Sequence, residues 1–262
     1  MNNIHSTAII SPDAVLGDGI TVGAYAIIEG DARLADGVVV EPQARILSGA
    51  RIGKNSKICS FAIIAGDPQD LHFDTSLKTY VEIGESTVVR EHATIHRATF
   101  EGKATKIGSN CLFMCSGHVG HDCVVGNGVI IASFAALAGH VHVDDNTFIS
   151  GGVMVHQRVR IGEGVMLSGN SAVSLDVPPF VTAFGRNSVG ALNLIGMNRR
   201  GIPRASIAEV KHLFGQVYAT QSARKNALAL LESGAAKTPE GRKFLEFFTM
   251  PERHYLVRRE EA

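Results

Sequence analysis

Aliphatic residues recur at every sixth position over most of this chain. The first run is unbroken and comprises Ile10, Leu16, Val22, Ile28, Leu34, Val40, Ile46, Ile52, Ile58 and Ile64. After a gap the spacing returns at Ile83, Val89 and Ile95, and then at Ile107, Phe113, Val119, Val125, Ile131, Leu137, Val143, Ile149, Val155, Ile161, Leu167 and Val173. A helix repeats about every 3.6 residues and a half-buried strand about every two, so neither produces this pattern.

A hexad is the repeat of a parallel β-helix, in which three short strands and three corners close one coil of about 18 residues. In the first run most residues two positions before each aliphatic are Ala, and such small side chains let the chain turn inward without a clash. A β-sandwich would instead show turn signals about every 8 to 12 residues. We therefore expect a mainly β protein, a left-handed parallel β-helix with a C-terminal α-helical domain.

The hexad repeat is interrupted twice and then ends, and these three points divide the chain. The polar segment 66–80 is expected to form a loop ejected from the coil, and a second break lies at about 99–106. The hexads stop at Val177-Pro178-Pro179, because proline cannot supply the hydrogen bonds of a β-ladder. We predict a β-helix over residues 1–186 and a helical domain over residues 187–262 that caps its open end.

Helix caps can be predicted in the C-terminal part. Asn187 or Ser188 is expected to cap the first helix, and Ser206 with Glu209 to form a capping box for the second. Pro239 suits the first position of the last helix. The helices are expected to end at about residues 199, 220, 233 and 250.

Composition and charge narrow the class of protein. No apolar run of about 18 residues and no signal peptide are found, so we expect a cytoplasmic protein without a transmembrane segment or a nucleic-acid partner. The four cysteines form neither a disulfide framework nor a Cys-x-x-Cys pair. Net charge is zero, but residues 186–262 carry 13 Lys and Arg against 7 Glu. This surplus favours an acidic partner or a phosphorylated ligand, although an ordinary solvated helical surface would also account for it.

The segment 117–122 interrupts the hexads with polar residues. Residues 18 apart stack one strand spacing apart in such a coil, so His121 is expected beneath Gly139 and Asp122 beneath His140. Imidazole is a suitable general base at neutral pH, and an adjacent carboxylate can fix its tautomer. A glycine N–H close by can stabilise an oxyanion. Together these groups are the parts that acyl transfer to a hydroxyl requires.

Histidines are concentrated in fewer than three coils, at His118, His121, His140, His142 and His156. Any one of them alone would be an ordinary surface residue, but the group indicates a site. Zinc is the main rival interpretation, because trimeric carbonic anhydrases on this same β-helix bind zinc through histidines of neighbouring chains. His-x-x-His spacing is not diagnostic by itself. We predict no metal, and a zinc-dependent lyase or hydratase and a non-catalytic scaffold stay open as alternatives.

Several segments occur in a specific order along the chain: HVGHDCVVGN, LAGHV, MVHQ, LDVPPF and GMNRRG, with QDL at 69–71 and TIHR at 94–97. Single hexads are shared by many acyltransferases, whereas this combination resembles the UDP-N-acetylglucosamine acyltransferases over nearly the whole chain. The resemblance implies transfer of a 3-hydroxyacyl group from acyl carrier protein to the glucosamine 3-OH of UDP-N-acetylglucosamine, the first step of lipid A biosynthesis. It also implies a homotrimer with active sites between subunits. No cofactor is expected, since 4′-phosphopantetheine arrives on the carrier protein.

The resemblance also assigns roles to residues. It makes His121 the general base, Asp122 its supporting carboxylate and Gly139 the source of the oxyanion-hole amide. The substrate-binding residues expected are Asp70 and His72 in the ejected loop, His118, His140, His156, Gln157 and Gly169 on the coils, and Asn193, Arg199 and Arg200 beyond them.

Asn193, Arg199 and Arg200 match positions that hold the nucleotide and its phosphates in the family. Arginines suit a diphosphate through bidentate hydrogen bonds, although Arg199 and Arg200 would also suit an ordinary helix C-terminus. Gly169 matches the position that sets acyl length, and a glycine there predicts a chain of about C12 to C14.

Two positions depart from the family pattern. His72 stands where the family often has Lys, and Ile195 where an acidic residue is common. Some family members prefer a 3-amino analogue of the sugar nucleotide and form an amide. The 3-hydroxy and 3-amino acceptors therefore both stay open.

Overall fold

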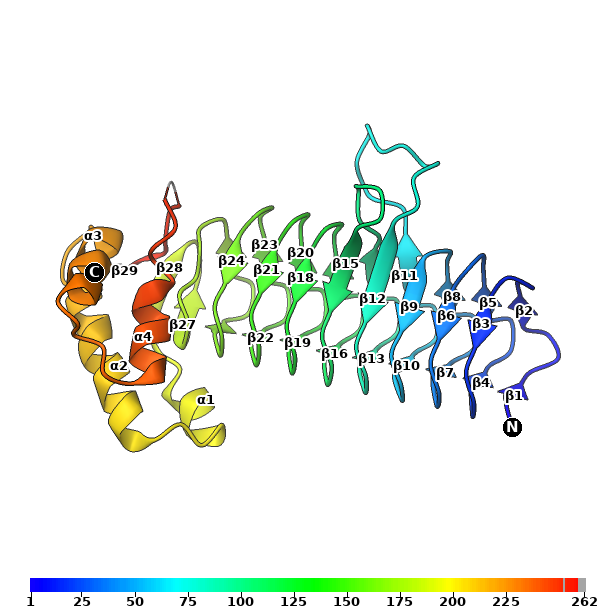
Figure 1. Ribbon diagram of the computed structural model, residues 1–262, viewed down its shortest axis with the longest axis horizontal. Helices are drawn as coiled ribbons and strands as arrows, with labels where there is room; N and C mark the ends of the chain where they lie inside the picture. The colour runs from blue at the N-terminus through cyan, green and yellow to red at the C-terminus, as the bar shows by residue number, and fades with distance from the viewer. Residues whose placement is uncertain (252, 259–262) are drawn as a thin grey trace.

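Short strands wind into a three-sided prism that ends in a group of helices (Figure 1). This computed structural model describes residues 1–251 and 253–258. Sheet A consists of β1 (Asn3–Ile4), β4 (Thr21–Val22), β7 (Val39–Val40), β10 (Lys57–Ile58), β13 (Val88–Val89), β16 (Leu112–Phe113), β19 (Ile130–Ile131), β22 (Phe148–Ile149), β25 (Met166–Leu167), β27 (Val181–Phe184), β28 (Ser188–Leu192) and β29 (Val257–Arg258).

The other two faces of the prism are built in the same way. Sheet B consists of β2 (Ile9–Ile10), β5 (Ile27–Ile28), β8 (Arg45–Ile46), β11 (Ile63–Gly66), β14 (Thr94–His96), β17 (His118–Val119), β20 (Ala136–Leu137), β23 (Met154–Val155) and β26 (Ala172–Val173). Sheet C consists of β3 (Val15–Leu16), β6 (Arg33–Leu34), β9 (Ala50–Ile52), β12 (Tyr80–Ile83), β15 (Ala104–Ile107), β18 (Val124–Val125), β21 (His142–Val143) and β24 (Arg160–Ile161). The chain visits A, B and C in turn, so successive coils stack in parallel.

Strand register follows the predicted coil length. His118 pairs with Ala136, 18 residues later, and the same step relates strands along each sheet. The two interruptions lengthen single coils, since Lys57 pairs with Val88, 31 residues later, and Val88 with Leu112, 24 residues later. The strands pair in register across both, but the six-residue phase shifts by one residue at the first interruption, between Ile64 and Ile83, and is kept across the second. The segment 67–79 leaves the prism as a loop between β11 and β12, and Figure 1 shows it projecting together with the shorter turn before β15.

The hexad aliphatics fill the prism. Ile46, Ile131 and Leu137 are 0% exposed, as are the alanines two positions before many of them. Ile10 and Leu16 in the first coil are only partly buried, because no coil covers them on the N-terminal side. Burying each such side chain contributes about 1.5–3 kcal/mol, so the repeat supplies most of the driving force for this fold.

The C-terminal end differs from the prediction in several places, including the second and last helices, which end at Val217 and Glu246 and not at about 220 and 250. Sheet A continues beyond the two prolines, because β27 pairs in parallel with β25 and β28 returns antiparallel beside it. The first helix, α1 (Leu194–Arg199), is capped by Asn193 and not by Asn187 or Ser188, since β28 occupies residues 188–192. The predicted capping box is wrong, because the Glu209 carboxylate accepts hydrogen bonds from Lys237 and Thr238.

Three further helices follow α1 in the described part of the chain. They are α2 (Arg204–Val217), α3 (Ala223–Glu232) and α4 (Pro239–Glu246). The last begins as predicted, with Pro239 in the first turn and Thr238 as its cap. Aromatic rings pack α2 and α4 together with the segments that follow them, and the ring centroids lie 4.7–6.5 Å apart among Phe214, Tyr218, Phe244, Phe247, Phe248 and Tyr255. Within the described residues, no helix is long and apolar enough to cross a membrane.

A buried carboxylate fastens the last described segment to the prism. Asp176 is 2% exposed and accepts hydrogen bonds from both Arg160 and Arg253. The guanidinium of Arg160 also stacks on Phe247, 4.4 Å from its ring centroid, and donates to its carbonyl. Since a buried charge is costly without partners, this pairing makes Asp176 the link between the last coil and the helical part.

Candidate active site

The stacked corners that follow β17 and β20 bring together four predicted site residues, and we call this region the histidine corner. The residues are His121, Asp122, Gly139 and His140. The His140 N–H donates to the carbonyl of His121 at 2.9 Å, which fixes one corner above the other. The predicted stacking of His121 beneath Gly139 and of Asp122 beneath His140 is therefore confirmed. Asp122 and His140 both have positive φ, 59° and 62°, as the sharp corner demands.

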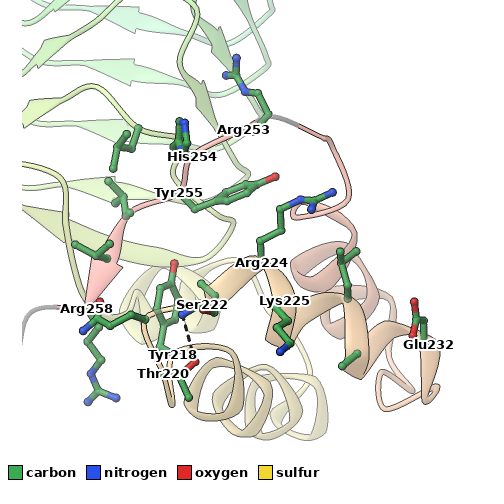
Figure 2. A pocket seen from close by; sticks show the side chains of 17 residues that line it. Tyr218, Thr220, Ser222, Arg224, Lys225, Glu232, Arg253, His254, Tyr255 and Arg258 are labelled. Atoms are coloured by element: carbon green, nitrogen blue, oxygen red, sulfur yellow. Dashed lines mark hydrogen bonds between the residues drawn. The ribbon is translucent and has the colours of Figure 1, made fainter.

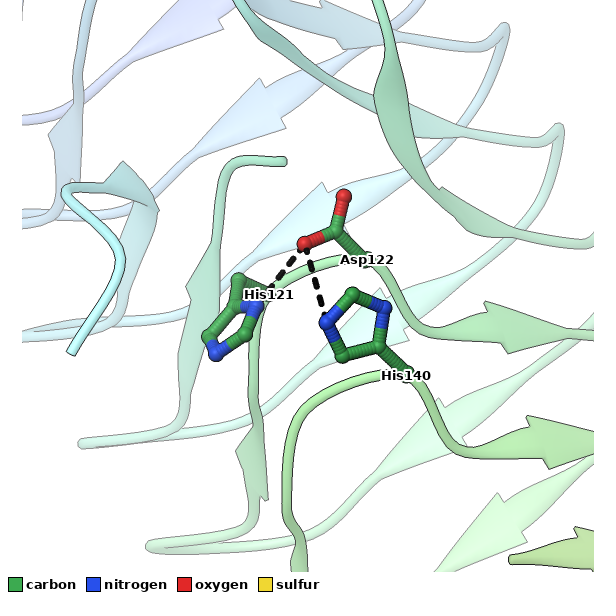
Figure 3. A group of neighbouring side chains, drawn as sticks. All are labelled: His121, Asp122 and His140. Atoms are coloured by element: carbon green, nitrogen blue, oxygen red, sulfur yellow. Dashed lines mark hydrogen bonds and ion pairs between the residues drawn. The ribbon is translucent and has the colours of Figure 1, made fainter. Parts of the chain in front are cut away.

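His121 and His140 both approach one carboxylate oxygen (Figure 3). The Nδ1 atom of His121 lies 2.8 Å from Oδ2 of Asp122, and Nε2 of His140 lies 3.8 Å from the same oxygen. The two imidazole rings are perpendicular, with centroids 5.0 Å apart. Because the carboxylate accepts a hydrogen bond from Nδ1–H, the Nε2 atom of His121 is left unprotonated as a base.

Gly139 lies directly against the edge of the His121 ring. A Cβ atom at Gly139 would stand 2.5 Å from Cε1 and 2.6 Å from Nε2 of His121, so any side chain there would push the ring aside. Within the described part of the chain, the Gly139 N–H donates to no protein acceptor. The open amide and the basic nitrogen therefore occupy the same small region.

Asp122 is held from a neighbouring loop. The Thr99 hydroxyl donates to Oδ2 at 2.7 Å and the Thr99 N–H to Oδ1 at 3.1 Å, while the Asp122 N–H donates to Thr105. Burial alone would raise the pKa of Asp122, but the hydrogen bonds from Thr99 and His121 outweigh it and lower the pKa. The carboxylate is thus charged and oriented at neutral pH.

The other two histidines of the corner region are kept neutral. Burial, helped by the neighbouring His96, lowers the pKa of His118 to about 4. Its Nδ1 atom lies 2.8 Å from the Thr94 hydroxyl, and its ring meets His96 edge to face at 5.1 Å. Burial also lowers the pKa of His140, against the opposing effect of Asp122.

A cavity of about 360 Å³ opens beside this corner. Of the predicted site residues, His118, His121, Gly139 and Gln157 line it. His156 is exposed and turns its ring toward the Gln157 carbonyl, so it does not join them. The remaining lining residues are Gln69, His96, Gly120, Ala136, Ala138, Met154 and Val155.

The ejected loop brings its residues toward the same side. Asp70 and His72 are both exposed, and the Asp70 carboxylate accepts the His72 N–H at 2.9 Å in a local turn. Gln69, the residue before Asp70, lines the cavity. Gly169 lies exposed in the corner after β25, where an added Cβ would meet only the Gly151 carbonyl at 3.4 Å.

The predicted nucleotide-binding residues lie on α1, away from this cavity. Asn193 caps the helix through the Gly196 N–H and donates to the Gly164 carbonyl. Arg199 is exposed, whereas Arg200 pairs with Glu163 at 2.8 Å and lies over the Phe180 ring. Arg200 thus has a structural role at the end of the prism, and one of its nitrogens is buried without a hydrogen-bond partner.

The corner could also be considered as a metal site. One ligand atom each from His121, Asp122 and His140 lie within 4.8 Å of one another. Oδ2 of Asp122, however, already accepts hydrogen bonds from the Thr99 hydroxyl and from His121. A cation shared by these three residues would compete with the hydrogen bond that orients His121. The absence of metal stays a prediction.

A larger hollow, of about 840 Å³, lies in the helical part (Figure 2). Several cations line it, but two of them hold the chain in place. Arg224 donates to the carbonyls of Thr249 and Met250, and Arg253 pairs with Asp176. The histidine corner therefore stays the candidate active site.

The contributors to this region that were not predicted as site residues include His96, Thr99 and Met154. His96 lies just before the second interruption and Thr99 at its start, where counting 18 residues no longer gives the neighbour in the next coil. Met154 faces outward from β23, and an outward methionine on a strand carries no signal of its own. The TIHR segment did mark the region of His96.

Comparison with known proteins gives a consistent result. A family described as UDP-N-acetylglucosamine O-acyltransferase, domain 2, matches residues 176–256. The acyl-[acyl-carrier-protein]–UDP-N-acetylglucosamine O-acyltransferase of Aliarcobacter butzleri is 49% identical over 220 residues, which cover 83% of this chain and 84% of that protein. The protein of the same name from Campylobacter concisus is 43% identical over 76% of this chain and 77% of its own length.

Solved structures agree over the full length. The UDP-N-acetylglucosamine acyltransferase from Campylobacter jejuni superposes with a TM-score of 0.92 at 37% identity, covering 98% of this chain and all of that one. LpxA from Acinetobacter baumannii gives a TM-score of 0.92 at 32% identity, covering 97% and 99%. The predicted left-handed parallel β-helix with a C-terminal helical part is confirmed.

Proposed function

The chain belongs to the family of UDP-N-acetylglucosamine O-acyltransferases, and from this we propose that it acylates the glucosamine 3-OH of UDP-N-acetylglucosamine with His121 as general base. The donor is a 3-hydroxyacyl group on acyl carrier protein, and the reaction is the first step of lipid A biosynthesis. The observation that carries the mechanism is the pairing of His121 with Asp122 directly beside the open amide of Gly139.

The reaction begins with a proton transfer. Nε2 of His121 takes the proton of the sugar hydroxyl as its oxygen attacks the thioester carbonyl carbon. Asp122 stabilises the imidazolium that forms, because its charged carboxylate already accepts a hydrogen bond from Nδ1–H. Thr99 contributes by fixing both carboxylate oxygens, so Asp122 does not rotate away when the charge on His121 changes.

The tetrahedral intermediate is stabilised at the same corner. Its oxyanion accepts the Gly139 N–H, which is free of competing acceptors in the described chain. Collapse breaks the carbon–sulfur bond, and the departing pantetheine sulfur receives the proton from His121. The ester product and the free carrier thiol are formed, and the enzyme returns to its starting state without any cofactor of its own.

Substrate contacts extend from this corner in two directions. His118, neutral at physiological pH, and Gln157 hydrogen-bond the substrates within the cavity, and the loop supplies Asp70 and His72 to the sugar. His140 and His156 border the groove, which Gly169 leaves open for an acyl chain of about C12 to C14. Asn193, Arg199 and Arg200 hold the uridine nucleotide and its diphosphate, for which Arg200 exchanges Glu163 for phosphate.

The active protein is a homotrimer with sites between neighbouring chains. Sheet A supports this, because its outward-facing side chains in five successive coils are apolar: Val88, Leu112, Ile130, Phe148 and Met166. The outward positions of sheet C instead include Arg33, Arg51, Glu82, Lys106 and Arg160. A contiguous apolar face of this kind is typical of an interface, and it leaves sheet C to the solvent.

Location and partners follow from the same assignment. The protein acts in the cytoplasm, where it meets soluble acyl carrier protein. The positive surplus of residues 186–262 favours an acidic carrier protein at this end.

An acyl-transfer assay tests this function. Purified protein is incubated with UDP-N-acetylglucosamine or its 3-amino analogue, and with 3-hydroxyacyl carrier proteins of graded length. Ester formation on the 3-OH, fastest at about C12 to C14, is expected. Faster amide formation on the analogue would reassign the acceptor, and stoichiometric zinc in the active protein would favour the lyase or hydratase alternative.

A further inference from the structure

The ejected loop is tied at its base by one arginine. Arg97 directly follows β14, and its side chain is only 13% exposed. The loop leaves the prism after Gly66 and returns at Tyr80, so its two arms must be brought together for it to keep one shape. Arg97 lies between these arms.

The guanidinium contacts both arms of the loop. On the outgoing arm it pairs with Oδ1 of Asp67, at 2.9 Å from Nε and 2.8 Å from Nη2. On the returning arm, Nη1 donates to the Leu77 carbonyl at 2.8 Å and Nη2 to the Thr75 carbonyl at 3.4 Å. The Phe73 ring near the tip stacks on it, with 4.9 Å between the guanidinium carbon and the ring centroid.

Arginine suits this position for a geometric reason. Its planar group carries five N–H donors in a fixed fork, so one side chain can bond a carboxylate and two carbonyls while a ring covers its face. A lysine ammonium in the same place could keep the charge contact with Asp67 but not the stacking on Phe73. The neighbouring His96 adds a second hold on the outgoing arm through the Asp67 carbonyl.

Two residues between the arms, Gln69 and Asp70, lie near the candidate active site. Gln69 lines the cavity together with His118 and His121, and Asp70 follows it directly. The carboxylate of Asp70 is close enough to oppose slightly the lowering of the pKa of His140, whose main cause is burial. The shape of the loop therefore decides where these acceptor-side groups stand.

We propose that Arg97 is a positioning residue that holds the loop in its acceptor-binding shape and thereby sets the affinity for the sugar nucleotide. The proposal rests on the proposed function for the identity of the acceptor. Arg97 touches neither His121 nor Asp122 in the described contacts, so its loss should weaken acceptor binding more than it slows the chemical step.

Steady-state kinetics of Arg97→Ala and Arg97→Lys test the proposal, with Arg51→Ala as the matched control. Arg51 pairs with Asp31, donates to backbone carbonyls and stacks on Tyr80, but makes no contact within segment 67–79. For Arg97→Ala we expect KM for the sugar nucleotide to rise about tenfold or more, with kcat reduced less than about threefold. Arg97→Lys should show a smaller rise in KM than Arg97→Ala, and Arg51→Ala should have the KM and kcat of the wild type.

A second measurement separates this proposal from the proposed function. Lys78 is exposed and is the only Lys or Arg in segment 67–79, so limited trypsin digestion at Lys78 reports the order of the loop without any substrate. Faster cleavage in Arg97→Ala than in Arg51→Ala supports the role of Arg97 in holding the loop, even if no acyl transfer is seen. Equal cleavage rates, an unchanged KM, or equal losses in both variants would overturn it.

Discussion

At the scale of single residues, the site depends on which nitrogen of His121 carries the proton. The Asp122 carboxylate accepts a hydrogen bond from Nδ1–H and leaves Nε2 as the base, next to the Gly139 amide. Neither residue could perform this role in another rotamer, because Thr99 holds the carboxylate and the ring lies against Gly139.

Asp122→Asn tests this arrangement with almost no change of size. An amide can donate to Nδ1 and so place the proton on Nε2, which would remove the base. We expect kcat to fall about 10²- to 10⁴-fold, with only a small loss of thermal stability from the weakened hydrogen bonds of Thr99. Asp144→Asn is the matched control, because Asp144 pairs with the exposed His142 at 2.9 Å on sheet C and should lose nothing. Equal activity of the two variants would contradict the assigned role.

His118 makes stability depend on pH. Its pKa is about 4 in the folded protein, lowered by burial and by His96, and about 6.5 in the unfolded chain. The unfolded chain therefore binds more protons between these values, and stability is lost as the pH falls from about 6.5 towards 4. We expect the melting temperature of His118→Gln to fall less than that of the wild type when the pH is lowered from 7.5 to 5. Parallel losses would show that His118 is not the group responsible.

At the scale of strands and loops, the hexad count predicted most of the architecture. It predicted the inward residues, the stacking of His121 beneath Gly139 and the loop that leaves after β11. The count works because each coil adds one ladder step in fixed register. It could not predict contacts across the second interruption, such as Thr99 with Asp122, because the added residues fold outward and their return point is set by tertiary contacts.

Helix caps were predicted less well, for a related reason. Ser206 and Glu209 have the spacing of a capping box. The Glu209 carboxylate instead accepts hydrogen bonds from the N–H and hydroxyl of Thr238, the cap of α4. A local pattern does not reveal a partner that is distant in sequence. The ion pair of Arg200 with Glu163 likewise could not be predicted from sequence spacing, because Arg200 ends α1 and Glu163 lies on a coil of the prism, 37 residues earlier.

Gly169 allows a test of the acyl groove. A side chain there meets only one carbonyl at 3.4 Å, so the fold should accept a larger residue. We expect Gly169→Met to shift the preferred donor to a chain at least about two carbons shorter, because a filled groove excludes methylenes. Competition between carrier proteins of graded acyl length, read by mass spectrometry, measures the shift. An unchanged preference would place the length limit elsewhere.

At the scale of the whole molecule, the apolar outer face of sheet A should control assembly and activity together. Ile130→Glu places a charge on that face, so we expect dissociation into monomers and loss of acyl transfer. Val124→Glu makes a similar change on the outer face of sheet C and should leave both intact. Light scattering after gel filtration, with the acyl-transfer assay, distinguishes the two. A trimeric, active Ile130→Glu variant would contradict the assignment of the interface.

The most direct test of the central claim is mass spectrometry of one reaction, run with the wild type and with His121→Ala. UDP-N-acetylglucosamine and a 3-hydroxyacyl carrier protein of about C12 to C14 are the substrates. The account predicts a product heavier by one acyl group with the wild type, and a rate at least about 10²-fold lower with His121→Ala. No acylated nucleotide from the wild type, or equal rates for the two proteins, would contradict it.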